Sequence, residues 1–292
     1  MRVLIIGGTK FIGPHVVRQF LDQGHDVLLY HRGKTEADLL KNVRHIHNSL
    51  AAMPVLGFPH ELLAELFDAV VHMIPMGEAD SRAAMKAFRG RAARVVALSS
   101  GDVYRAYGRL TGTELGSIEE GLLHEDSPLR SVLYPYRRQA KSAADWTYDY
   151  EKILVEREIL GDRDLPGVVL RLPKVYGPGN NADLATVYAF RHRPQWRWTH
   201  GYVENVAAAI VLAATHPAAS GRIYNVGESP TPTVGERLAG LPPSSIPTDE
   251  SRQFNLAQDI AYDTSRIRSE LGYAEHVPSA EGLRHTLAWR NQ

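Results

Sequence analysis

The first residues of the chain constrain its fold more than any other stretch. Residues 2–6, RVLII, are predicted to form a buried strand, and the FIGPHVVRQFLDQG that follows Gly7-Gly8 and two further residues has the apolar spacing of an amphipathic helix. Pro14 fits the first turn of this helix and Gly24 fits its end. A glycine turn between a strand and a helix presents backbone N–H groups to a phosphate, but such turns also occur without a ligand. Lys10 stands where a G-x-x-G-x-x-G loop has its middle glycine, so the turn by itself leaves its role open.

The same alternation continues over the first two-thirds of the chain. The runs DVLLY, VRHIH, DAVVHMI, RVVALSS and GVVLRLP alternate with helical patterns, among them residues 79–88 and a long helix over 143–160. Several runs are apolar at successive positions, which is typical of strands buried on both faces. The sequence therefore predicts the α/β class with a doubly wound parallel sheet.

Beyond Leu172 the pattern changes to loops rich in Gly, Pro, Asn and Ser. We predict a main domain of residues 1–175, completed by about 201–226, and a smaller lobe of residues 176–200 and 227–292. In open α/β sheets ligands bind at the carboxyl ends of the strands, so we expect this lobe to border the substrate.

Composition excludes several classes of function. The 33 basic and 33 acidic residues give a net charge of zero, which argues against nucleic acid or an anionic membrane as a partner. The absence of cysteine excludes disulfides, thiolate catalysis and zinc held by cysteine. A strand from the second residue leaves no room for a signal peptide, and no apolar run is long enough to span a bilayer, so we expect a cytoplasmic protein.

The 13 histidines require metal binding to be considered. His45 and His47 alternate along a predicted strand and share one face. Two ligands are too few for a metal ion, and no carboxylate is spaced to complete the set. We also expect neither His72 nor His200 to be a ligand, so the sequence predicts no metal site.

A tyrosine and a lysine give the strongest chemical signal. YDYEK places Tyr148 and Lys152 four residues apart, on one face of the predicted helix over 143–160. A lysine ammonium beside a tyrosine hydroxyl favours the phenolate, which can accept a proton. Upstream, the strand ending in LSSGDVY supplies the hydroxyl of Ser100, whereas we expect Ser99 to make only structural hydrogen bonds.

Together these motifs resemble the extended short-chain dehydrogenases/reductases, the family of nucleotide-sugar epimerases and dehydratases. The resemblance covers nearly the whole chain and rests on seven segments in the expected order: GGTKFIG, VVALSSGDVY, YDYEKILVERE, VVLRLPKVYGPGN, GYVENVAAAI, RIYNVGE and DTSRIRSELGY. It implies an NAD(P)-binding Rossmann fold and an enzyme that transfers a hydride. It also implies Tyr148 as the acid/base, Lys152 as its partner and a ligand of the nicotinamide ribose, and Ser100 as the catalytic hydroxyl.

The resemblance also assigns binding residues. Besides Tyr148 and Lys152, the cofactor contacts it implies are Gly7, Thr9, Lys10, Phe11, Ile12, Gly13, Arg32, Pro173 and Val175. The substrate contacts we predict are Asp102, Asn180, Arg197 and His200. Arg197 and His200 belong to a loop of basic and aromatic residues, and arginine binds phosphate through its planar fork. The same loop is equally consistent with a basic surface anchored by Trp196 and Trp198.

Four departures from the family pattern stand out. Lys10 replaces the middle glycine, and the second strand ends in Leu29-Tyr30-His31-Arg32 without the acidic residue that holds the ribose of NAD. Arg32 favours the 2′-phosphate of NADP, so we predict NADP, with NAD as the alternative. Asn48 stands where an aspartate usually contacts the adenine. Ser100 and Tyr148 are further apart than the family leads us to expect, and the insertion of about 105–146 is predicted to form a flap over the active site.

The sequence leaves the reaction open between two kinds of hydride transfer. Overall resemblance favours an epimerase acting on a nucleotide sugar, and an NADP preference favours a ketone or aldehyde reductase. A dehydratase is disfavoured because Gly101 and Asp102 replace the Asp-Glu pair that follows the catalytic hydroxyl residue in dehydratases. A non-catalytic NADP-binding protein, or an RNA-binding protein like the chloroplast stem-loop-binding branch, is the alternative of another class. The resemblance further implies a homodimer.

Overall fold

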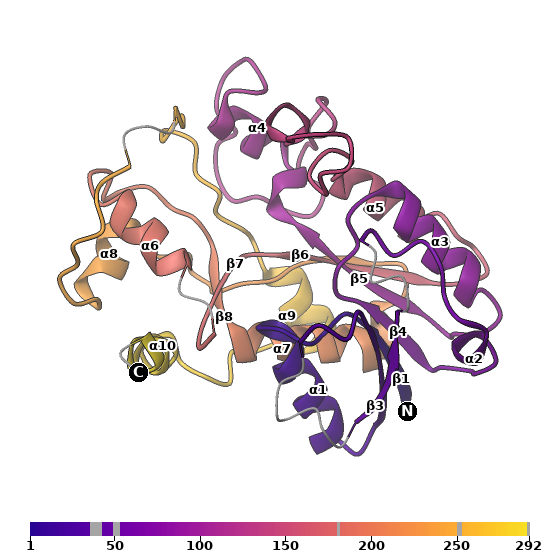
Figure 1. Ribbon diagram of the computed structural model, residues 1–292. Helices are drawn as coiled ribbons and strands as arrows, with labels where there is room; N and C mark the ends of the chain where they lie inside the picture. Colours follow the sequence, from indigo (N-terminus) through magenta and orange to yellow (C-terminus); the bar gives the residue numbers. More distant parts are fainter. Residues whose placement is uncertain (36–42, 49–52, 180–181, 250–252, 291–292) are drawn as a thin grey trace. The chain divides into compact units, whose positions relative to one another are not determined.

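A parallel sheet forms the centre of the structure, a computed structural model that describes residues 1–35, 43–48, 53–179, 182–249 and 253–290. Its strands lie in the order β3-β2-β1-β4-β5-β6-β9 (Figure 1). Their bounds are Arg2–Ile6 (β1), Asp26–His31 (β2), Arg44–His47 (β3), Ala69–His72 (β4), Val95–Ser100 (β5), Gly167–Leu172 (β6) and Ile223–Asn225 (β9). The predicted α/β class with a doubly wound sheet is confirmed.

The N-terminal strand β1 is the middle of this sheet. It pairs in parallel with β2 on one side and with β4 on the other. Leu4, Ile5 and Ile6 are completely buried, because helices cover both faces of the sheet. One face packs against α3 (Glu78–Phe88) and α5 (Lys152–Leu160), and α1 (Ile12–Asp22) lies on the opposite face (Figure 1).

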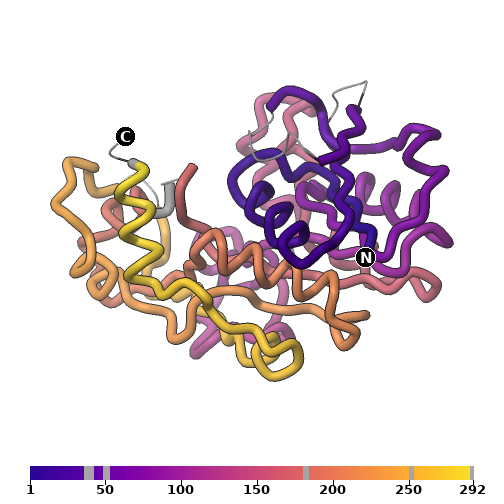
Figure 2. The backbone as a smooth tube through the Cα atoms, turned by 90° about the horizontal axis from the view of Figure 1, so that it is seen from below, coloured from indigo at the N-terminus to yellow at the C-terminus, as the bar shows by residue number. Residues whose placement is uncertain are grey.

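Two compact units make up the chain. The first comprises residues 1–100, 133–171 and 207–223, which the tube in Figure 2 shows as indigo to violet, pink and orange stretches. The second comprises residues 101–132, 172–206 and 224–292. Compactness does not show that a unit folds alone, so the predicted domain boundaries stay a prediction.

The remaining elements are short. They are α2 (His60–Leu63), η2 (Gly101–Val103), α4 (Arg105–Thr111), η3 (Arg137–Gln139), β7 (Lys174–Tyr176), α6 (Ala182–Ala189), β8 (His200–Tyr202), α7 (Val203–Thr215), η4 (Pro217–Ala219), α8 (Val234–Ala239), α9 (Ser265–Leu271) and α10 (Ser279–Arg290). The strands β7 and β8 form a separate parallel pair in the second unit. No helix in the described part of the chain combines the length and the apolar character needed to cross a membrane.

The predicted long helix over 143–160 is wrong in its first half, because α5 begins at Lys152. The carboxylate of Glu151 caps α5 by accepting a hydrogen bond of 2.9 Å from the N–H of Ile153. Upstream, the Asp145 carboxylate accepts from the backbone N–H and the hydroxyl of Thr147, at 3.0 and 2.8 Å. Side chains that bind nearby N–H groups favour turns and helix starts over helix interiors. Residues 143–150 accordingly form turns and bends.

Candidate functional site

The turn after β1 requires its two glycines. Gly7 and Gly8 have φ angles of +93° and +81°, in the left-handed region that glycine adopts without strain. A Cβ atom on Gly8 would lie 2.8 Å from Cγ2 of Ile5. The N–H of Gly7 donates to the carbonyl of Tyr30 at 2.8 Å, which ties the turn to β2.

Gly13 brings α1 directly against this turn. A Cβ atom on Gly13 would lie 2.1 Å from the carbonyl oxygen and 2.2 Å from the carbonyl carbon of Gly8. Phe11 precedes the helix with a φ of 49° and makes no capping hydrogen bond through its side chain. A helix N-terminus that approaches a glycine turn without a side-chain cap is suited to an anionic group such as a pyrophosphate.

Lys10 is exposed and fits this turn without a glycine. The left-handed conformation falls on Phe11, the next residue, and not on Lys10. The carbonyl of Lys10 accepts the N–H of Gly13 at 3.0 Å, and the hydroxyls of Thr9 and Thr35 lie 3.1 Å apart. The missing middle glycine is therefore compatible with the backbone of a phosphate-binding turn.

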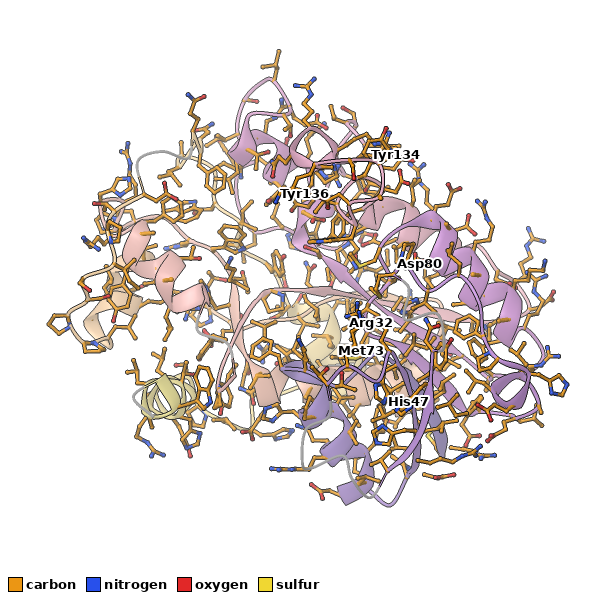
Figure 3. All side chains as sticks on the ribbon, in the orientation of Figure 1. Arg32, His47, Met73, Asp80, Tyr134 and Tyr136 are labelled. Carbon is orange, nitrogen blue, oxygen red and sulfur yellow. The ribbon has the colours of Figure 1, made fainter. Side chains whose placement is uncertain are left out.

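Arg32 and Met73 directly follow β2 and β4 at the carboxyl ends of these strands (Figure 3). Arg32 is exposed. The N–H of Met73 donates to the carbonyl of Ile6 at 3.0 Å, and the N–H of Asn48 donates to the carbonyl of His31 at 2.7 Å. The chain thus continues the sheet pairing beyond the strand ends, where ligands of open α/β sheets bind.

The two serines at the end of β5 differ in their surroundings. Ser99 is buried and its hydroxyl donates to Oε1 of Glu156 at 2.6 Å, the structural role expected of it. Arg171 also donates to the Glu156 carboxylate, through Nε at 2.9 Å and Nη2 at 2.7 Å. Ser100 is the last residue of the strand and is half-buried. Because side chains alternate along a strand, it points away from the face that Ser99 occupies.

Lys152 is the first residue of α5, and its side chain is buried. Its ammonium donates to the carbonyl of Leu98 at 3.0 Å and to the carbonyl of Pro75. It also lies 5.4 Å from the ring centroid of Tyr150. Two carbonyls and an aromatic ring therefore fix a positive charge beneath the carboxyl ends of β4 and β5.

Tyr148 lies in the turn before α5, so the predicted placement of Tyr148 and Lys152 on one helical face is wrong. The guanidinium of Arg137 stands 4.6 Å from the ring centroid of Tyr148, and its Nε donates to the Tyr148 carbonyl at 2.9 Å. The same guanidinium lies 3.5 Å from the ring centroid of Tyr134. Figure 3 labels Tyr134 and Tyr136, which come from the same aromatic segment. An arginine thus positions Tyr148, and Tyr150 is the tyrosine beside Lys152.

Two buried ionisable residues that the sequence analysis did not assign to the site also belong to this region. His72, at the end of β4, is completely buried, and burial together with the Lys152 cation lowers its pKa to about 3. Asp80 accepts the N–H groups of Met76 at 2.7 Å and Gly77 at 2.9 Å, and burial raises the pKa of its carboxyl. Asp80 was detectable as an acidic residue in the first turn of a helix.

The other predicted binding residues belong to the second unit or lie outside the described residues. Pro173 precedes β7 and Val175 lies within it, Asp102 is buried in η2, and Asn180 lies outside the described residues. His200 is buried in β8, where burial and the Arg237 cation hold its pKa well below the usual value. Its Nδ1 donates to the carbonyl of Trp198 at 2.6 Å.

The basic and aromatic loop contains both anchored and exposed side chains. The indole of Trp196 donates to the carbonyl of Gln258 at 2.8 Å, and Arg191 donates to the carbonyls of Tyr188 and Ile246. Arg197 is exposed and lines an open pocket of the second unit with Thr231 and other residues. The lining also includes Leu122, Ser229, Pro230, Pro232, Glu236, Arg237, Tyr262, Ser279 and Leu283. Arg197 therefore remains a candidate for a ligand, whereas Trp196 and Arg191 stabilise the loop.

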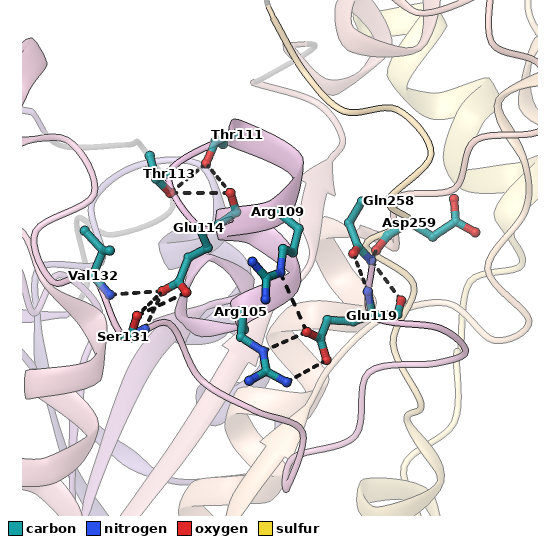
Figure 4. A network of polar contacts seen from close by, with 11 residues as sticks. Arg105, Arg109, Thr111, Thr113, Glu114, Glu119, Ser131, Val132, Gln258 and Asp259 are labelled. Atoms are coloured by element: carbon teal, nitrogen blue, oxygen red, sulfur yellow. Dashed lines mark hydrogen bonds and ion pairs between the residues drawn. The ribbon is translucent and has the colours of Figure 1, made fainter. Parts of the chain in front are cut away.

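Polar contacts order the part of the insertion that belongs to the second unit (Figure 4). Arg105 donates to both carboxylate oxygens of Glu119, at 2.7 and 3.1 Å. Glu114 accepts the N–H groups of Ser131 and Val132, the latter at 3.0 Å. Residues 133–146 of the insertion belong to the first unit. The predicted flap stays a prediction.

Comparison with known families decides what this arrangement is. A model of the NAD dependent epimerase/dehydratase family matches residues 3–227. The chain belongs to this family. It therefore belongs to a family of NAD-dependent enzymes, as the resemblance implied.

Individual relatives of the epimerase/dehydratase chain are distant. The uncharacterized protein y4nL of Sinorhizobium fredii (strain NBRC 101917 / NGR234) is 23% identical over 189 residues, or 49% of this chain and 53% of that protein. The chain thus spans about half the length of this curated relative. TunA, an NAD-dependent NDP-hexosamine 5,6-dehydratase involved in tunicamycin biosynthesis, is 19% identical with a TM-score of 0.72, covering 100% of this chain and 98% of its own. The UDP-glucose 4-epimerase of Thermus thermophilus, in complex with NAD, is 21% identical with a TM-score of 0.70, covering 100% and 99%. These structures confirm the Rossmann-type fold.

The buried His72 of this epimerase/dehydratase chain makes stability depend on pH. Its folded-state pKa of about 3 lies below the unfolded value of 6.5, so below pH 6.5 the unfolded chain binds a proton that the folded chain does not. The free energy of unfolding should therefore fall by about 1.4 kcal/mol for each pH unit below 6.5. Urea unfolding at pH 7.5 and 5.5 measures this loss for the parent and for His72→Leu. Equal pH dependence in the two proteins would contradict the prediction.

Proposed function

We propose that the protein is an NAD(P)-dependent epimerase or oxidoreductase that transfers a hydride at a carbinol carbon of a nucleotide-sugar-like substrate. The observation that carries this proposal is the fixed ammonium of Lys152, held by the carbonyls of Leu98 and Pro75 two residues from the end of β5 and three from the end of β4. The first unit also contains Ser100 and the glycine turn before α1. A cation, a hydroxyl and a pyrophosphate site on one sheet edge suit a nicotinamide cofactor and a carbinol substrate.

The residues present fit a dinucleotide, which supplies hydride acceptance and donation when bound. Gly7, Gly13 and the N-terminus of α1 would hold the pyrophosphate, because they combine left-handed glycines with an uncapped helix end. The ammonium of Lys152 would donate to the nicotinamide ribose. Ser100 would orient the carbinol hydroxyl, and Tyr148 would take up its proton.

The runner-up is an NADPH-dependent ketone or aldehyde reductase with the same residues. A panel of UDP-glucose, UDP-galactose, UDP-glucuronic acid and simple carbonyl compounds, assayed with both cofactors, separates the two. An epimerase inverts a sugar centre with no net change in nicotinamide absorbance, whereas a reductase consumes NADPH. Cofactor binding without turnover over the panel would favour a non-catalytic NADP-binding protein, and salt-dependent binding of structured RNA would favour the RNA-binding alternative.

Arg32 should give the protein a preference for NADPH over NADH. We expect Arg32 to neutralise the 2′-phosphate, because it is exposed directly after β2, where NAD-binding chains have an acidic residue. Arg32→Gln should weaken NADPH binding by about 10-fold, the effect of one charged hydrogen bond, and leave NADH binding unchanged. Fluorescence titration measures both affinities.

Arg18→Gln, which removes an exposed arginine of α1, is the matched control and should leave both affinities at the parental values. Equal or reversed affinity of the parent for the two cofactors would refute the role of Arg32. The homodimer and the cytoplasmic location that the family resemblance implies stay predictions, the former open to analytical ultracentrifugation.

A further inference from the structure

The register of β2 against β3 brings three histidines onto one face of the sheet edge. His31 pairs with His47, and Leu29 pairs with His45. Paired residues of neighbouring strands share a face, and so do residues two apart. His31, His45 and His47, called the imidazole cluster below, therefore share a face, and Ile46 between two of them points to the hydrophobic core on the other.

The ring nitrogens of the imidazole cluster converge. Nε2 of His31 lies 2.6 Å from Nδ1 of His45, and one nitrogen from each of the three rings lies within 4.8 Å of the other two. The ring centroid of His31 is 4.9 Å from that of His45 and 4.8 Å from that of His47. Three nitrogen donors thus surround one point at the end of the β2–β3 pair.

Burial within the imidazole cluster decreases from one residue to the next. His31 is buried, His45 is half-buried and His47 is exposed at the end of β3 (Figure 3). Solvent can therefore reach the point between the rings from the side of His47, so that a metal ion has a route of entry and water can serve as a further ligand.

We propose that the imidazole cluster binds one divalent transition-metal ion, with Zn²⁺ as the representative of its class. Three imidazoles and an open position for water form a common zinc site, and imidazole also suits Cu²⁺, Ni²⁺ and Co²⁺. A tetrahedral ion with Zn–N bonds of about 2.0–2.1 Å places its ligand nitrogens about 3.3 Å apart. Small rotations of the half-buried and exposed rings reach that spacing from the separations of 2.6 to 4.8 Å.

The hydrogen bonds of His31 define what ion binding changes. The N–H of Gly33 donates to Nδ1 of His31 at 3.1 Å, so the proton of the neutral ring is on Nε2, and Nε2 donates to Nδ1 of His45. Coordination through Nε2 moves this proton to Nδ1, and the Gly33 N–H then bonds to water. Gly33 is exposed, so this exchange requires no rearrangement of the core.

An anion is the other ligand that a histidine cluster can take, and the geometry favours the metal ion. Anion binding requires protonated rings whose N–H groups point to a shared oxygen. Here an acceptor nitrogen of His45 faces the N–H of His31, so at least one converging nitrogen carries a lone pair and no proton. Protonating three rings in contact also places like charges close together.

The test uses tag-free protein dialysed against EDTA. Co²⁺ titration should give the visible absorption of a tetrahedral ion, and Zn²⁺ in competition with a chromogenic chelator should bind at one ion per chain. His47→Ala should weaken Zn²⁺ binding by about 10-fold or more, and His45→Ala with His47→Ala should abolish it. His60→Ala, which removes an exposed histidine outside the cluster, is the matched control and should bind as the parent does.

Two results would overturn the metal site: no Zn²⁺ binding at micromolar concentration, or binding that the double variant retains. Urea unfolding of each variant shows whether it is folded, and the exposed position of His47 makes its removal tolerable. If Zn²⁺ fails to bind while His47→Ala weakens NADPH binding, the cluster serves the cofactor phosphate and the proposal is wrong. The assay needs no turnover, so its outcome is independent of the proposed function.

Discussion

Tyr148→Phe should lower the rate of hydride transfer by about 10²–10⁴-fold, the range for loss of a general acid or base. The change removes one hydroxyl, and the phenylalanine ring can still pack against Arg137, whose guanidinium lies 4.6 Å from the tyrosine ring centroid. The fold and the cofactor affinity should therefore be unchanged. Single-turnover rates with the best substrate of the nucleotide-sugar panel measure the first effect, and NADPH titration measures the second.

Tyr150→Phe is the matched control, because it makes the same substitution two residues away. The ring of Tyr150 packs against the Lys152 ammonium at 5.4 Å, and phenylalanine preserves that contact. We expect less than about 10-fold loss of rate for this variant. The reverse outcome, a large loss for Tyr150→Phe and a small one for Tyr148→Phe, would transfer the acid/base role to Tyr150.

Local sequence signals predicted the elements that depend on neighbouring residues. The strand β1, the glycine turn and α1 follow one another within the first 22 residues, and each is determined by apolar spacing and by Gly7 and Gly8. The helix predicted over 143–160 failed because spacing does not reveal which N–H groups a carboxylate will bind. Asp145 binds the N–H and hydroxyl of Thr147 in a turn, and Glu151 binds that of Ile153 to start α5 at Lys152.

Tertiary contacts between distant residues explain the rest of the difference. His45 and His47 were counted as two ligands because nothing in the sequence states that β3 pairs with the end of β2. The register of that pair adds His31. Likewise, His72 and Lys152 come from β4 and α5, and only the packing of α5 against β5 shows why the lysine ammonium lowers the pKa of the histidine.

Gly13→Ala should abolish NAD(P) binding and destabilise the first unit by about 3 kcal/mol, the upper end for overpacking of a tight contact. The new Cβ would lie 2.1 Å from the carbonyl oxygen of Gly8, and the backbone of the glycine turn cannot rotate away as a flexible side chain would. The start of α1 must then move away from the turn, and the two no longer enclose a pyrophosphate. Urea unfolding and cofactor titration measure the two effects.

Gly57→Ala is the matched control, because a Cβ atom there meets nothing within 4 Å and φ lies outside the left-handed region. It should leave cofactor binding unchanged and raise the free energy of unfolding by up to about 1 kcal/mol, since alanine restricts the unfolded chain. Retention of cofactor binding by Gly13→Ala would mean that α1 can move away from Gly8 without loss of the phosphate site. The close approach of α1 to the glycine turn would then not be what makes this turn a dinucleotide site, and Lys10 or Arg32 would have to supply the affinity.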